Sequence, residues 1–105
     1  MMKLLTKEIE KAIPELGSQD GTGYDAIAYV KFFTPDGGWT WYATEYDPKE
    51  REFFGLVDGQ YKEMGYFFLN ELESIRGVFG LPVERDLYFK PTKLSELTKE
   101  VSDAS

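Results

Sequence analysis

The stretch from residue 26 to residue 47 constrains the fold most, because it is typical of two strands joined by a tight turn. Residues 26–34 (AIAYVKFFT) alternate along an extended chain. One expected face carries Ala28, Val30 and Phe32, and the other carries Ile27, Tyr29, Lys31 and Phe33. The turn sequence PDGG follows at 35–38, and residues 39–47 (WTWYATEYD) are again rich in strand-forming residues. This pattern predicts an antiparallel hairpin.

The rest of the chain predicts a second hairpin and three short helices. Residues 53–59 and 61–69 are expected to be strands around a turn at Asp58-Gly59, and a further strand is expected after Pro82. The expected helices cover residues 6–13 with Thr6 as N-cap, residues 70–77 ended by Gly77, and residues 92–101 with Thr92 as cap.

These elements together predict an α+β fold. We expect a mainly antiparallel sheet of about five strands, with two or three short helices packed on one face. A chain of 105 residues predicts a single compact domain over residues 1–105, with a C-terminus that frays after about residue 101.

Composition removes several kinds of chemistry. The chain contains no cysteine and no histidine, so Ser–His–Asp and Cys–His catalysis and the usual zinc sites are excluded. Its formal charge is −7, from 19 acidic and 12 basic residues, which argues against direct nucleic-acid binding. Charges interrupt the apolar patch near the N-terminus, and no long apolar run follows, so we expect a cytoplasmic protein without a membrane span.

The aromatic strand at residues 39–47 has two expected faces. Trp39, Trp41, Ala43 and Glu45 fall on one side, and Thr40, Tyr42, Thr44 and Tyr46 on the other. We expect Trp39 and Trp41 to be largely in the core. Tyr42 and Tyr46 would then lie on an outer face beside Glu45 and Asp47, where tyrosines often contact a protein partner.

Five segments taken in order resemble a known family. They are AIAYVKFF, WTWYATE, FFGLV, GYFFLNELESIRG and LPVERDLYFKP, between about Leu4 and Leu97. The chain is similar to the small bacterial domain of unknown function 2958. The resemblance implies a protein carried on plasmids, conjugative elements and phage-like islands, and it implies no activity. Family members tend to place Ser where Phe68 stands, so only Glu71 remains of an S-x-x-E capping box.

The segment Glu84-Arg85-Asp86 is the best candidate for catalysis. On a strand both carboxylates share a face, and such pairs perform acid/base chemistry or hold a divalent cation. The alternative is a solvated polar face on which Arg85 pairs with an acid elsewhere. The glycine-rich loop at 17–23 lacks a phosphate-binding motif.

Two functions remain open. The first is a binding module without cofactor or catalytic residues, which contacts an unidentified protein. The sharper form is an accessory or anti-defence factor whose carboxylates occupy a nucleic-acid-binding surface. The candidate contact residues are Tyr42, Glu45, Tyr46, Asp47, Glu84, Arg85 and Asp86. The second is a small carboxylate-dependent, divalent-metal-assisted hydrolase. An aromatic platform for single-stranded nucleic acid or sugar is a further possibility, and the oligomeric state stays open.

Overall fold

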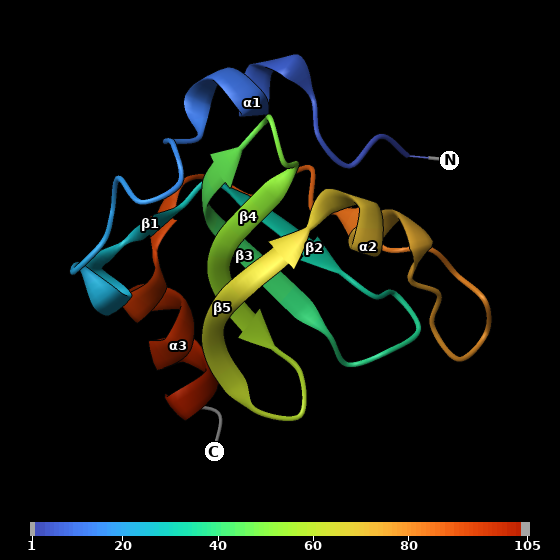
Figure 1. Ribbon diagram of the computed structural model, residues 1–105. Helices are drawn as coiled ribbons and strands as arrows, with labels where there is room; N and C mark the ends of the chain where they lie inside the picture. The colour runs from blue at the N-terminus through green and yellow to red at the C-terminus, as the bar shows by residue number, and fades with distance from the viewer. Residues whose placement is uncertain (1, 104–105) are drawn as a thin grey trace.

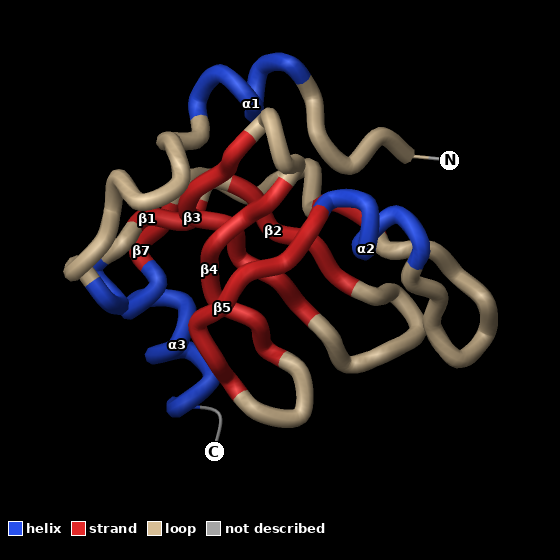
Figure 2. The backbone as a smooth tube through the Cα atoms, viewed as in Figure 1, coloured by secondary structure: helices blue, strands red, loops and turns tan. Residues whose placement is uncertain are grey.

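The computed structural model describes residues 2–103, with side chains for residues 2–98, and its centre is an antiparallel five-stranded sheet (Figures 1 and 2). The strand order is β5-β4-β3-β2-β6. The strands are β2 (Val30–Phe33), β3 (Thr40–Asp47), β4 (Glu52–Asp58), β5 (Lys62–Phe68) and β6 (Glu84–Arg85). Both predicted hairpins, the α+β class and the strand number are confirmed.

The predicted strand at 26–34 is split in two. Its first part, β1 (Ile27–Ala28), leaves the main sheet and pairs with β7 (Thr92–Lys93). The break falls at Tyr29, whose N–H donates to the Ala43 carbonyl oxygen at 2.8 Å. Only the second part, β2, continues beside β3. The alternation in the sequence could not reveal this change of partner, because the buried and half-buried residues keep alternating through the break.

The short helices begin and end near their predicted positions, with two corrections. Helix α1 (Lys7–Ala12) has the expected N-cap, since the Thr6 hydroxyl accepts from the Ile9 N–H at 3.2 Å. Helix α2 (Leu69–Ser74) ends before Gly77. Its first turn keeps half of a capping box, because the Glu71 carboxylate accepts from the Phe68 N–H at 3.0 Å.

The C-terminal helix, α3 (Leu94–Asp103), starts later than predicted. Thr92 does not cap it, because Thr92 belongs to β7 and its hydroxyl donates to the Lys90 carbonyl oxygen at 2.6 Å. The expected fraying after about residue 101 stays a prediction: α3 extends to Asp103, and residues 104–105 lie outside what is described. A single turn of 3₁₀ helix, η1 (Gly23–Asp25), completes the elements.

A β-bulge in β3 reverses the expected faces of its second half. The register with β4 shifts between Ala43 and Glu45, so Tyr46 pairs with Phe53 and Glu45 pairs with Phe54. Tyr46 therefore lies on the same face as Trp41, and Glu45 lies on the opposite one. The prediction from strict alternation is wrong beyond Ala43 for this reason.

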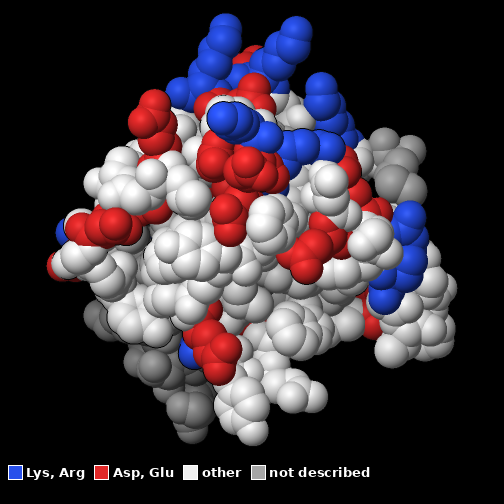
Figure 3. All heavy atoms as spheres, viewed as in Figure 1, with Lys and Arg blue, Asp and Glu red and all other residues white. Residues whose placement is uncertain are grey.

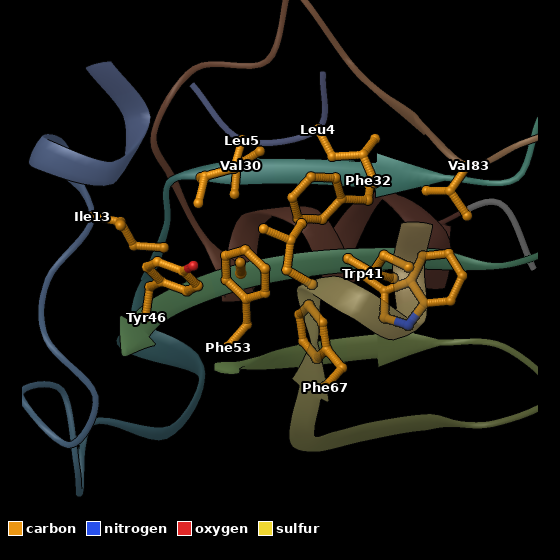
Figure 4. Packing of buried hydrophobic residues seen from close by; sticks show 13 residues of the cluster. Leu4, Leu5, Ile13, Val30, Phe32, Trp41, Tyr46, Phe53, Phe67 and Val83 are labelled. Atoms are coloured by element: carbon orange, nitrogen blue, oxygen red, sulfur yellow. The ribbon is translucent and has the colours of Figure 1, made fainter. Parts of the chain in front are cut away.

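The sheet carries a hydrophobic cluster on each face. The larger, cluster 1, contains Phe32, Trp41, Tyr46, Phe53 and Phe67 and is covered by α2 and the segment that leads into α1 (Figure 4). The smaller, cluster 2, packs Leu94 of α3 against Leu56 and Ala28. The predicted one-sided arrangement holds for α1 and α2 but is wrong for α3, which covers the other face. Within the described residues, no helix is long and apolar enough to cross a membrane.

Candidate functional site

An open apolar hollow of about 500 Å³ lies at the end of cluster 1. It is formed where the β2–β3 turn meets the segment that follows α2. Its lining residues are Thr34, Gly37, Trp39, Trp41, Ile75, Arg76, Gly77 and Val78. Its volume falls within the range of ordinary ligand or side-chain pockets.

The two tryptophans form one wall of this hollow. Their rings are stacked, with centroids 6.0 Å apart and an angle of 25° between the planes. Trp41 is buried, as expected, but 43% of Trp39 is exposed. Gly59 leaves room for the Trp39 ring, because a Cβ at residue 59 would lie 2.3 Å from this ring. The core prediction therefore holds for Trp41 only, because nearly half of Trp39 is exposed.

Large apolar side chains lie exposed on the loop that follows α2, and one of them, Val78, lines the hollow. Val78 and Phe79 are 81% and 84% exposed, and Leu81 is 46% exposed. We call Trp39, Val78, Phe79 and Leu81 the apolar patch. The apolar patch was not predicted from the sequence, although one signal was present. The segment GVFGLP, at 77–82, places apolar residues between glycines and a proline, where neither a helix nor a strand could bury them.

Asp36 fixes the backbone of the loop at 77–82, which bears Val78, Phe79 and Leu81 of the apolar patch. Its Oδ2 accepts from the Phe79 N–H at 2.7 Å and from the Leu81 N–H at 3.2 Å. Gly77 allows this approach, because a Cβ there would lie 1.5 Å from Asp36 Oδ1. The close approach of Asp36 therefore explains why residue 77 is a glycine, and the end of α2 does not. The apolar side chains are therefore presented on an ordered loop.

Two of the predicted contact residues are buried. Glu45 is 2% exposed, and its carboxylate accepts from the N–H groups of Gly17, at 2.6 Å, and Gln19, at 2.8 Å. Tyr46 is 3% exposed and packs on Phe53, with ring centroids 4.5 Å apart. Burial raises the pKa of the Tyr46 hydroxyl, and the neighbouring Arg51 opposes this rise. A partner reaches neither side chain in this conformation.

Three others lie together at the edge strand β6. Glu84, Arg85 and Asp86 line a second hollow of about 350 Å³. The Lys31 Nζ lies 3.7 Å from Asp86 Oδ2 and 5.9 Å from the centroid of the Tyr42 ring. Lys31 therefore contacts two of the predicted contact residues, Tyr42 and Asp86. Among the residues with described side chains, Arg85 forms no ion pair with an acid. Its guanidinium donates to the carbonyl oxygens of Lys3, at 2.6 Å, and Leu4, at 3.3 Å.

The predicted carboxylates do not form one row. Asp47 lies at the far end of β3, where its Oδ1 accepts from the Lys49 N–H at 2.9 Å. Glu45 is buried between these regions. Among the residues with described side chains, no group of three or more His, Cys, Asp or Glu residues is arranged to hold a metal ion. Glu84 and Asp86 are thus not joined by a third acidic ligand.

Comparison with known proteins gives the family but no relative of known function. No curated protein matched the chain. No solved structure matched it. Residues 4–104 match the family model described as "Protein of unknown function (DUF2958)", nearly the whole chain, so this protein belongs to that family.

Proposed function

We propose that this chain is a non-enzymatic binding module that acts by protein–protein contact, with the apolar patch as its main contact. The observation that carries the proposal is the exposure of Trp39 and Val78 at one hollow and of Phe79 and Leu81 on the same loop as Val78. A monomeric protein rarely leaves large apolar side chains together in water, and such patches mark interaction sites. Aromatic residues beside a pocket are also the commonest anchors of protein interfaces.

The fixed backbone of the loop at 77–82 also supports a role in protein–protein contact. Because Asp36 already fixes the backbone at Phe79 and Leu81, a partner would not have to order this loop on binding. Immobilising a flexible loop opposes association, so an ordered loop favours affinity.

The finer proposal is an accessory or anti-defence factor of a plasmid or conjugative element, acting in the host cytoplasm. The support is the net charge of −7, together with Glu84 and Asp86 on the surface of β6 and the segment after it. An acidic surface attracts a basic partner and speeds association at low salt. The apolar patch would then hold a host protein by its nucleic-acid-binding surface.

No specific observation favours the hydrolase. That function needs a third acidic ligand beside Glu84 and Asp86, and the described residues offer none. Asp86 is also engaged by Lys31.

Quantitative affinity capture from host lysate tests the binding proposal. We expect one host protein to be retained by the wild type at low salt and released as salt rises. Phe79→Ser should lower its retention about tenfold or more, because an exposed anchor is lost. Tyr66→Thr is the matched control, since Tyr66 is 62% exposed but lies on the other face of the sheet. An empty capture, or equal retention by Phe79→Ser, would refute the proposal.

A further inference from the structure

A third hollow, of about 240 Å³, is lined by positive side chains although the protein is acidic. It lies where the N-terminal segment, the β3–β4 turn and the start of α2 meet. Lys3, Lys7 and Arg51 line it, together with Thr6, Glu10 and Tyr46. Figure 3 shows Lys and Arg side chains at this end of the molecule, over α1, with Asp and Glu side chains among them. Three cations against one lining carboxylate favour an anionic ligand.

The backbone beneath these cations is fixed. Arg51 has a φ of +56°, in the left-handed region, and its carbonyl oxygen accepts from the Leu69 N–H at 2.9 Å. The Lys3 carbonyl oxygen is held by Arg85 at 2.6 Å. Lys7 begins α1, whose N-cap is in place. Three separate segments thus bring positive charge to one hollow.

A buried hydroxyl forms part of the wall. Tyr46 is 3% exposed, and its pKa is raised by burial, so it is neutral and keeps its proton at physiological pH. The Arg51 side chain hydrogen-bonds with this hydroxyl and opposes the rise of its pKa. A neutral O–H beside cationic groups suits an oxyanion, which accepts hydrogen bonds from both kinds of donor.

We propose that this hollow binds a phosphate group, held by Lys3, Lys7 and Arg51 and by the hydroxyl of Tyr46. Arg51 is available because its pair with Glu73 is long, 3.5 Å, and both side chains are nearly half exposed. Such a pair contributes little, and a phosphate is a strong competitor for a guanidinium. Glu10, the carboxylate among the lining residues, opposes binding, as does Glu73 beside Arg51.

The site is independent of the proposed protein contact. Tyr46 and Trp41 lie at opposite ends of cluster 1 in Figure 4, so the phosphate hollow and the apolar patch are separated by the core. A variant of either one leaves the other unchanged.

Titration by NMR at constant ionic strength tests this proposal, with inorganic phosphate and glycerol phosphate as separate probes. We expect saturable shifts of the amides of Lys7, Arg51 and Leu69. Tighter binding of glycerol phosphate would identify a phosphate monoester as the ligand, and tighter binding of inorganic phosphate would identify the free anion.

Four variants decide whether the hollow is responsible. Lys7→Gln and Tyr46→Phe should each weaken binding about threefold to tenfold, whereas Glu10→Gln should tighten it by a similar factor. Lys11→Gln is the control, since Lys11 belongs to the same helix but does not line the hollow. Shifts that do not saturate, or equal weakening by Lys7→Gln and Lys11→Gln, would overturn the proposal. So would a Glu10→Gln variant that binds no more tightly.

Discussion

At the scale of single residues, Glu45 holds the glycine-rich loop from inside the fold. Its carboxylate accepts two backbone N–H groups of that loop, and Gly17 adopts a φ of +93° there. Gln19 adds a second connection, because its amide group donates to the carbonyl oxygens of Ile27 and Thr44. The loop therefore surrounds the carboxylate of Glu45. The N–H groups of Gly17 and Gln19 already donate hydrogen bonds to this carboxylate.

Replacing this buried carboxylate should destabilise the fold. In Glu45→Gln the amide keeps one acceptor oxygen but turns an NH₂ group toward a backbone N–H. We expect a loss of about 1–3 kcal/mol in the free energy of unfolding, measured with urea. Glu63→Gln is the control, because Glu63 is exposed on β5. A Glu45→Gln variant as stable as the control would contradict the structural role.

At the scale of the elements, the bulge in β3 decides which residues enter the core. It brings the backbone of β3 very close to β4 at Gly55, where a Cβ would lie 1.9 Å from the Tyr42 carbonyl oxygen. The neighbouring strand has its own glycine directly opposite, Gly65, and a Cβ there would meet nothing within 4 Å. Two adjacent glycines thus differ sharply in what surrounds them.

This difference predicts opposite results for the same substitution. Gly55→Ala forces the two strands apart, so we expect a loss of about 3 kcal/mol or more, or failure to fold. Gly65→Ala should leave stability unchanged or raise it by up to about 1 kcal/mol, because alanine reduces the freedom of the unfolded chain. Thermal and urea unfolding of both variants would measure this. Equal effects at the two positions would contradict the close approach of β3 to Gly55.

The elements were predictable to the extent that their signals are local. The hairpins follow from alternation and turn residues, and the N-cap of α1 follows from Thr6. The bulge has no comparable signal, since it depends on how β3 fits β4. The position of α3 was also hidden, because its contact with Leu56 joins residues far apart in the sequence.

At the scale of the whole molecule, the surface has two regions of different character. The apolar patch lies at one end of cluster 1, and the positively lined hollow lies at the other. A net charge summed over the chain cannot reveal the second region, because charge is distributed by folding. The contact residues expected from the sequence are divided in the same way: Glu45 and Tyr46 are buried, whereas Glu84 and Asp86 remain on the surface.

Site-specific photo-crosslinking in host cells can show whether Phe79 and its neighbours contact a protein partner. A photoreactive phenylalanine analogue would replace Phe79 in one variant and Tyr66 in another, since both positions are exposed but lie on different surfaces. We expect one covalent adduct of defined mass from position 79 and none from position 66. No adduct at position 79, or the same adducts at both positions, would contradict it.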